Sequence, residues 1–300
     1  MTAAGAEVFE QHRVYLRGLG YRMTGSLADS EDLLQEAYLR WQQVTEPVEN
    51  ARAYLSKLMT NLCLDWLKSA RVVRESYIGT WLPEPVLDEG ALMPDASTEL
   101  AQDVSVALML ALERLSPLER AAFLLHDVFD VDYADVAETL SKSEDACRQL
   151  AARARSHLQD DRPRRRPSDR EAERVLMAFG QARLGDISAL RAVLAEDAVF
   201  YTDGGGRVPS AIMPIRGRED IARFLDGVMR KFYPLKLDGT DRPNPDAPEW
   251  RPAWINGLPG VVGRVRGRVM QTLAFDIQDG EIKAAYAIRN PDKLRRVADA

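Results

Sequence analysis

The sequence predicts a multidomain protein in which two all-α modules are followed by an α+β domain. Three observations lead to this fold class. Apolar residues recur at helical spacing through most of residues 7–158. Stretches rich in proline and charge, at 76–98 and 159–169, interrupt that pattern. After residue 170, segments of alternating apolar and polar residues separated by glycine turns predict strands.

Composition sets the broad class of the protein. Its 300 residues suffice for two or three domains, and 46% apolar with 29% charged residues is typical of a globular protein. No apolar run approaches the ~20 residues that a membrane span needs, and the first residues lack the pattern of a secretory signal. Cys63 and Cys147 have neither metal-ligand nor disulfide-framework spacing, which favours the cytoplasm. The net charge of -6 argues against indiscriminate nucleic-acid binding.

Residues 7–44 are predicted to form a pair of amphipathic helices that meet near Thr24-Gly25. Ser26 or Asp29 can cap the second helix. The polar side of that helix is acidic in its first turn. The helix dipole alone would explain this acidity, and the alternative is a contact face for a basic partner.

Residues 50–76 are predicted to form a further helical pair with basic and aromatic side chains interleaved. Cations among aromatic rings suit melting or single-stranded DNA, because phosphates attract the cations and exposed bases stack on the rings. The alternative is a solvated basic face over core aromatics. The basic residues are Arg52, Lys57, Lys68, Arg71 and Arg74, set against Asp65, with Tyr54 and Trp66 among them.

Residues 130–158 are predicted to form two short helices around a tight corner, with Ser143 as the cap of the second. Small, basic and amide side chains on the outer face of that second helix suit a helix that reads the major groove. An ordinary helical hairpin is the alternative, since the corner lacks the glycine common in helix-turn-helix units. The inward residues are Val136, Ala137 and Leu140, then Cys147, Leu150, Ala151, Ala154 and Leu158; the outward ones are Arg148, Gln149, Ala152, Arg153, Arg155 and Ser156.

The order of these segments resembles the sigma-70 family of RNA polymerase sigma factors, of the extracytoplasmic-function (ECF) type. The stretches YRMTGSLADSEDLLQEAYLRW (21–41) and ARAYLSKLMTNLCLDWLKSAR (51–71) are similar to region 2. LERLSPLERAAFLLHDVF (112–129) and the helix-turn-helix are similar to region 4. The resemblance implies region 2 at 1–77, an acidic linker at 78–98, region 4 at 99–160 and a second linker at 161–169.

The resemblance also implies partners and site residues. Members of that sigma factor family bind core RNA polymerase, through the β′ clamp and the β subunit, and promoter DNA, with no membrane partner. The acidic helix would contact polymerase through Asp29, Asp32, Gln35, Glu36 and Arg40. The basic helix would read the unwound −10 element through Asn50, Arg52, Lys57, Asn61, Asp65, Lys68 and Arg71. The last helix of region 4 would read the −35 element through Arg148, Gln149, Arg153 and Arg155.

Pro83, Pro85 and Pro94 forbid a regular helix in the first linker, which is also acidic. One interpretation is a connection that Trp81 pins to a neighbouring domain. The other comes from WLPEP (81–85), which resembles a signature of one sigma-factor group that carries a C-terminal SnoaL-like domain. In that group the linker would extend along the polymerase cleft and imitate nucleic acid by its charge.

Residues 170–300 resemble the cone-shaped SnoaL-like α+β fold, with helices at 170–184, 186–195 and 215–232, a strand at 199–202 and four later strands. NPDKL (290–294) is predicted to start a terminal helix, with Asn290 as its cap. DGGGR (203–207) alone is more often a hairpin turn than a ligand site. WLPEP, DGGGR and NPDKL together follow the order of that sigma-factor group, where they would tune the sigma modules. The implied regulatory residues are Trp81, Leu82, Pro83, Glu84, Pro85, Asp203, Gly204, Gly205, Gly206, Arg207, Asn290, Pro291, Asp292, Lys293 and Leu294.

The C-terminal domain offers little for catalysis. All three histidines precede residue 170, and no pair of acids among Asp197, Tyr201, Asp203 and Asp276 has diagnostic spacing. We therefore expect no enzyme, no catalytic residue, no metal and no cofactor, and leave open whether the cone holds a small ligand. The residues expected to line the cone's core are Trp250, Trp254, Phe275 and Tyr286.

The hypothesis that accounts for most of the chain is a cytoplasmic sigma factor that recognises −10 and −35 elements and is tuned in cis by its C-terminal domain. A ligand-sensing helix-turn-helix regulator that never contacts polymerase would leave residues 21–75 without a role. An enzyme that uses the cone cavity is the least favoured alternative.

Overall fold

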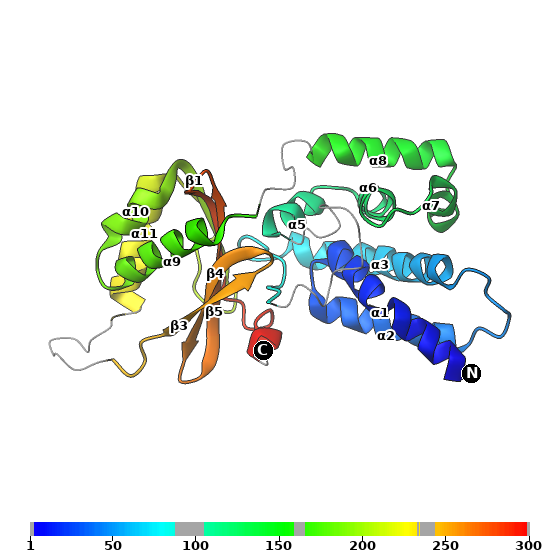
Figure 1. Cartoon of the computed structure of the whole chain (residues 1–300), viewed down its shortest axis with the longest axis horizontal. Coiled ribbons are helices and arrows are strands. Elements are labelled where there is room, and N and C mark those ends of the chain that lie inside the picture. Colours follow the sequence, from blue (N-terminus) through cyan, green and yellow to red (C-terminus); the bar gives the residue numbers. More distant parts are fainter. Residues whose placement is uncertain (1–2, 88–104, 159–165, 233, 235–243, 299–300) are drawn as a thin grey trace. The chain divides into compact units, whose positions relative to one another are not determined.

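The computed structural model describes residues 3–87, 105–158, 166–232, 234 and 244–298 (Figure 1). The chain divides into two compact units. The helical unit comprises residues 1–76 and 88–163, and the C-terminal unit comprises 77–87 and 164–300. The stretch 77–87, which contains WLPEP, therefore packs with the C-terminal unit.

Three helices form the first module of the helical unit: α1 (Ala3–Thr24), α2 (Leu27–Gln42) and α3 (Ala51–Glu75). Gly25, with φ of 70°, ends α1, and the Ser26 hydroxyl caps α2 by accepting a hydrogen bond from Asp29 N at 3.1 Å. The predicted pair of helices at 50–76 is wrong. This segment is the single helix α3, because it contains neither glycine nor proline to end a helix.

The second module consists of α5 (Val106–Glu113), α6 (Pro117–Phe123), the π-helical turn η2 (Leu124–Val128), α7 (Tyr133–Leu140) and α8 (Glu144–Leu158). Ser141 takes the left-handed conformation (φ 52°) at the α7–α8 corner, the place that glycine often fills. Ser143 Oγ accepts from Ala146 N, as the predicted cap requires. The five residues predicted to face inward on α8 are the buried ones.

The two modules pack on each other within the helical unit, where α1 contacts α5 and α6, and α3 contacts α6 and α7. A buried arginine joins them. Arg120 donates to the Leu112 and Met23 carbonyls at 2.9 and 2.7 Å, and its guanidinium lies 2.8 Å from the Glu113 carboxylate. A buried guanidinium is tolerated only when its donors are paired, so these contacts fix the register between α1 and α6.

The C-terminal unit is an α+β domain, which with the helical modules confirms the predicted fold class. Its helices are α9 (Asp169–Arg183), α10 (Ile187–Val193) and α11 (Arg218–Phe232). One sheet runs in the order β2-β1-β6-β5-β4-β3, with β1 and β6 parallel and the other pairs antiparallel. The strands are β1 (Leu194–Asp203), β2 (Ile215–Arg216), β3 (Glu249–Ile255), β4 (Leu258–Val265), β5 (Arg268–Gln278) and β6 (Glu281–Ile288).

The main core of this unit lies between α9–α11 and one face of the sheet (Figure 1). Phe275 belongs to that core, and Trp250 packs against it. The expectation for the other two aromatics is wrong. Trp254 is half-buried and stacks under the Arg166 guanidinium at 4.1 Å, and Tyr286 stacks on Tyr201 on the opposite face of the sheet. The position of Tyr286 follows from the strand alternation, because Phe275 pairs with Ala285 and neighbouring residues face opposite sides of the sheet.

NPDKL does not begin an α-helix. Residues 291–294 form turns, and the terminal helix α12 spans Arg295–Ala298. The Asn290 side chain accepts from Asp292 N at 3.0 Å, while Lys293 N and Leu294 N reach back three residues to Asn290 O and Pro291 O. This i→i+3 bonding is tighter than an α-helix and directs the Lys293 side chain back toward β1.

Candidate functional site

The acidic face of α2 is a continuous polar strip. Asp32, Gln35 and Arg40 are exposed, Asp29 and Glu36 are half-buried, and Arg40 Nε lies 2.8 Å from Glu36. Their spacing of three and four residues places all five on one side of the helix. Leu39 lies beside them, with 46% of its surface exposed. Leu39 was not among the residues predicted from the sequence. An apolar residue in the polar period of the helix was the available signal.

The predicted −10 residues lie along α3, where two of them contact the second module. The Arg52 guanidinium stacks on the Tyr15 ring at 4.8 Å and donates to the Phe129 carbonyl at 3.4 Å. Lys57 forms an ion pair of 2.9 Å with Glu138 on α7. In this arrangement α7 covers part of the basic face of α3. Asn50 caps the start of α3 through Ala53 N, Asn61 is exposed, Lys68 pairs with Asp65 at 2.8 Å, and the Arg71 side chain lies outside the described residues.

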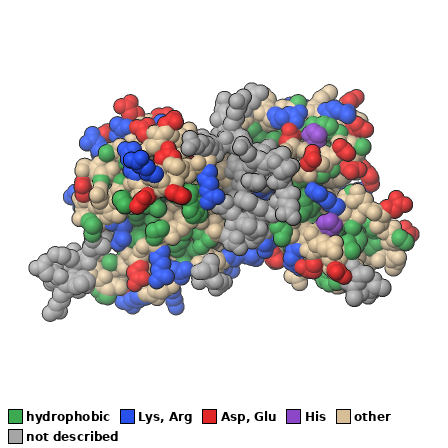
Figure 2. Space-filling model, in the orientation of Figure 1, with side chains coloured by type: hydrophobic (Ala, Val, Ile, Leu, Met, Phe, Trp, Pro, Cys, Tyr) green, Lys and Arg blue, Asp and Glu red, His purple; other side chains and the backbone are tan. Residues whose placement is uncertain are grey.

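The predicted −35 residues form the exposed face of α8, and each of its three arginines has an acidic partner. Arg148 pairs with Glu144 at 2.7 Å and stacks on the Tyr133 ring at 5.0 Å. Arg153 pairs with Glu119 and Arg155 with Asp127, at 2.9 and 2.6 Å. Gln149 is exposed between them. The Arg148–Glu144 pair is exposed, and ion pairs at the surface are worth little, about 0–1 kcal/mol, so phosphates and bases can displace Glu144, whereas Glu119 and Asp127 are mostly buried. On the face drawn in Figure 2, acidic and basic side chains are interspersed.

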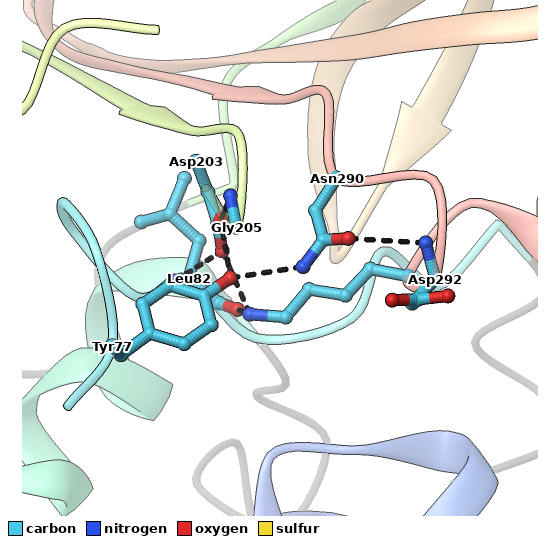
Figure 3. Close-up of polar contacts among 7 residues, drawn as sticks. Tyr77, Leu82, Asp203, Gly205, Asn290 and Asp292 are labelled. Atoms are coloured by element: carbon cyan, nitrogen blue, oxygen red, sulfur yellow. Dashed lines mark hydrogen bonds and ion pairs between the residues drawn. The ribbon is translucent and has the colours of Figure 1, made fainter. Parts of the chain in front are cut away.

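The C-terminal unit holds the WLPEP stretch through a buried carboxylate. Asp203, at the end of β1, has a fully buried side chain that accepts from Tyr77 Oη at 2.5 Å, Leu82 N at 2.9 Å and Gly205 N at 2.9 Å. Lys293 Nζ lies 2.7 Å from the same carboxylate and donates to the Leu82 carbonyl. We call Tyr77, Leu82, Asp203, Asn290 and Lys293 the linker clamp (Figure 3).

Aromatic rings complete the surroundings of the Lys293 ammonium. Its Nζ lies 4.2 Å from the centroid of the Trp81 ring and 5.1 Å from that of Tyr77, at distances where the ring quadrupole attracts a cation. Only 10% of the Lys293 side chain is exposed. A nearly buried ammonium is stable only when it is paired, and here a carboxylate, a carbonyl and two rings pair it. WLPEP, DGGGR and NPDKL are thus joined in one cluster.

Glycine is required where the DGGGR turn meets NPDKL. Gly205 has φ of 60°, and a Cβ added to it would lie 2.2 Å from the Asn290 amide nitrogen. That amide donates to Tyr77 Oη at 2.9 Å. Any side chain at this position would therefore push Asn290 away from Tyr77. Arg207 and Asp292 add an exposed ion pair of 3.1 Å between the two motifs.

The residues after Trp81 are buried along the C-terminal unit. Leu82, Val86 and the intervening Pro83, Glu84 and Pro85 are all buried. Val86 forms two hydrogen bonds with Asn256: its backbone N donates to Asn256 Oδ1 at 3.0 Å, and its carbonyl accepts from the backbone N of Asn256 at 2.8 Å. Glu84 is enclosed with its neighbours, so residues 82–86 present no acidic surface here, and the position of the linker along the polymerase cleft stays a prediction. Residues 88–98 lie outside the described part of the chain.

Tyr77 and Asn256 were not predicted from the sequence as functional residues. Tyr77 lies four positions before Trp81, the first residue of the WLPEP stretch, and its aromatic hydroxyl was the local signal. Burial, and then the hydrogen bond to Asp203, raise the pKa of Tyr77 well above its usual value.

This pKa predicts an alkaline loss of stability. Tyrosine in the unfolded chain ionises near pH ~10, whereas Tyr77 in the fold keeps its proton, so the unfolded state becomes more stable relative to the fold as pH rises above ~10. The free energy of unfolding, measured with urea at about pH 8 and at about pH 11, should fall more between the two pH values for the wild type than for Tyr77→Phe. Equal losses in the two proteins would contradict the role of this hydroxyl.

The acids considered for catalysis do not converge in the described residues. Asp197 is exposed, Asp203 is committed to the linker clamp, and Asp276 is buried and accepts from Gln278. Within the described residues no three His, Cys, Asp or Glu side chains are grouped as a metal site. None of the described helices is long and apolar enough to cross a membrane.

Comparison with known proteins agrees with the arrangement of modules. Residues 8–72 match the family model for sigma-70 region 2, and residues 105–158 match that for sigma-70 region 4. The chain is 39% identical to the ECF RNA polymerase sigma factor SigJ of Mycobacterium tuberculosis over 95% of this chain and 92% of that protein. It is 34% identical to the probable ECF RNA polymerase sigma factor SigI of the same species, over 94% of this chain and 92% of the relative.

The three-dimensional comparison extends over both units. The crystal structure of M. tuberculosis SigJ matches with a TM-score of 0.72 at 35% sequence identity, covering 96% of this chain and 98% of that one. Two sigma-70 regions in the expected order, with relatives similar over almost the whole length, identify the family. The chain belongs to the extracytoplasmic-function RNA polymerase sigma factors.

Proposed function

We propose that this sigma factor binds core RNA polymerase and directs promoter-specific initiation by reading −10 and −35 elements. The observation that carries the proposal is the order of surfaces along one chain: an acidic strip on α2, a basic-aromatic helix α3 and the arginine-bearing face of α8. Such a protein acts in the cytoplasm, where transcription takes place. Sigma factors are not enzymes, and the role that we propose for the C-terminal unit is regulatory.

The acidic strip would dock on a basic surface of the β′ clamp, with Leu39 as an apolar anchor among Asp32, Gln35 and Glu36. Interface cores commonly place one apolar side chain inside a polar rim. The second module would contact the β subunit. Co-elution with core polymerase on gel filtration tests this proposal, and a chain that elutes apart from polymerase at low salt contradicts it.

Promoter reading requires a change from the arrangement described above. Lys57 and Arg52, proposed to contact the −10 element, are engaged with Glu138 and the Phe129 carbonyl of the second module. We infer that α7 separates from α3 when the sigma modules bind polymerase. Surface ion pairs are weak enough for polymerase and promoter contacts to replace them.

Arg148 is proposed to make a base contact in the −35 element. Arg148→Ala should weaken binding at one base position by ~1–3 kcal/mol and relax the preference there, because a bidentate arginine–guanine contact is lost. The measurement is transcription from promoters that carry each of the four bases at every −35 position. Arg191→Ala, which removes an equally exposed arginine from α10, should leave the base preferences unchanged.

The C-terminal unit is proposed to regulate the sigma modules in cis through the linker clamp. The linker leads directly from α3 toward the second module, and residues 77–87 are held by Asp203, Lys293 and Asn256. Holding this stretch leaves fewer residues of the chain to connect the two modules, which would limit how far they can separate. We propose the boundaries 1–77 for region 2, 99–160 for region 4 and 170–300 for the regulatory domain.

A further inference from the structure

A cavity of about 230 Å³ lies between α11 and the core-facing side of the sheet. Its walls are mostly apolar, with Phe200, Phe224 and Val228 among the lining residues. This volume is somewhat below the ~300–1,000 Å³ of pockets for drug-sized ligands, and it suits a smaller molecule with an apolar body.

The polar groups of the cavity favour an anion. Arg289 lines the cavity and donates through Nη1 to the Pro209 carbonyl, while its Nε is buried and has no hydrogen-bond partner in the described part of the protein. Among the described residues that line the cavity there is no aspartate or glutamate. A buried guanidinium donor without an acceptor is unfavourable, and a carboxylate is the acceptor that fits its planar geometry.

The cavity and the linker clamp share two strand ends. Thr202 lines the cavity and the next residue, Asp203, holds the linker; Arg289 lines the cavity and the next residue, Asn290, bonds Tyr77. Successive residues of a strand face opposite sides of a sheet, so one pair of strand ends serves both sites. Arg289 N and Asn290 N both donate to the Asp203 carbonyl, at 2.7 and 3.0 Å, which ties the two ends together.

The segment that covers the cavity is the continuation of the DGGGR turn. Thr202 Oγ1 donates to the Ala211 carbonyl at 3.0 Å, and Arg289 donates to that of Pro209, so both strand ends hold this segment in place. The DGGGR turn itself contacts the linker clamp, since Gly205 lies against Asn290. A ligand that draws the guanidinium away from Pro209 therefore disturbs the segment that supports Asn290.

We propose that this cavity binds a small monocarboxylate with an aromatic or branched apolar body, that Arg289 pairs with its carboxylate, and that its binding loosens the linker clamp. The regulatory consequence rests on the proposed control in cis, whereas the binding site does not.

The test is calorimetric titration of the full chain with 2-naphthoate and with 4-methylvalerate. At least one should bind saturably, with a Kd of about 1 mM or tighter, as expected of a fragment-sized ligand. Arg289→Met should weaken that binding about tenfold or more, and the corresponding carboxamide should bind the wild type about tenfold more weakly, because a charge-assisted hydrogen bond is lost. Arg251→Met, an exposed arginine of β3 outside the cavity, is the matched control and should bind like the wild type.

Hydrogen exchange measures whether ligand binding in the cavity loosens the linker clamp. The Leu82 amide, which donates to Asp203, should exchange faster when the ligand is bound. Saturable binding by neither probe, or equal binding by Arg289→Met, would overturn the site; unchanged exchange at Leu82 under saturation would overturn the coupling. Transcription by the ligand-free protein does not depend on this result, so failure of the site leaves the proposed sigma function standing.

Discussion

Asp203→Asn is expected to lower the free energy of unfolding of the C-terminal unit by about 3–5 kcal/mol, the usual cost of removing one partner from a buried ion pair. The Asp203 carboxylate accepts from Tyr77, Leu82, Gly205 and Lys293. Asparagine has one acceptor oxygen, and its amide group would face donors. The Lys293 ammonium would then be left nearly buried without its counter-charge. Urea unfolding and hydrogen exchange at the Leu82 amide measure the two consequences.

Asp197→Asn is the matched control. Asp197 lies on the same strand, but 83% of its side chain is exposed and its ion pair with Lys283 is long, at 3.6 Å. This change should alter stability by no more than about 0.5 kcal/mol, as is usual at the surface. If Asp203→Asn unfolds like Asp197→Asn and Leu82 stays protected, the linker clamp does not hold the linker.

Asp32→Lys combined with Glu36→Lys is expected to weaken binding to core polymerase by about 30-fold or more. Both carboxylates lie on the acidic strip of α2. Replacing them with lysines reverses their charge, so the strip would repel a basic partner instead of attracting it. An interface hot spot is worth about 2 kcal/mol or more, and 1.4 kcal/mol corresponds to a factor of ten. Fluorescence anisotropy of labelled protein titrated with core polymerase gives the dissociation constant.

The control for net charge is Glu219→Lys with Asp220→Lys. These residues stand in the first turn of α11, in the C-terminal unit, and both are exposed. The pair of changes alters the net charge by the same amount on the other unit of the chain. Equal weakening by both double variants would mean that overall charge, rather than the α2 strip, determines the affinity.

Local patterns were sufficient for most of the secondary structure. The inward face of α8 followed from residues three and four apart, and Ser143 and Ser26 cap as their positions predict. The sequence pattern failed where local rules compete. Pro291 suggested a helix start, yet Asn290 and Lys293 are drawn into bonds with Tyr77 and Asp203, and the chain turns more tightly before α12 begins.

The candidate site residues likewise divide into those that local patterns predict and those that depend on tertiary packing. Exposure of the α2 and α8 residues could be predicted, because it follows from helix period. The linker clamp could not, since Tyr77 and Asp203 are 126 positions apart and Asn290 is 213 from Tyr77. The pairing of Lys57 with Glu138, 81 residues away, depends likewise on tertiary packing. The three motifs were recognisable by resemblance, but the chemistry that joins them required coordinates.

We propose that this chain initiates transcription and that the linker clamp sets its activity. Run-off transcription with purified core polymerase, on the promoter upstream of the protein's own gene, tests both parts. We expect a specific transcript from the wild type, its loss with Asp32→Lys/Glu36→Lys, and a several-fold change in its amount with Asp203→Asn but not with Asp197→Asn. No specific transcript from the wild type, or the same amount from Asp203→Asn as from Asp197→Asn, would contradict the account.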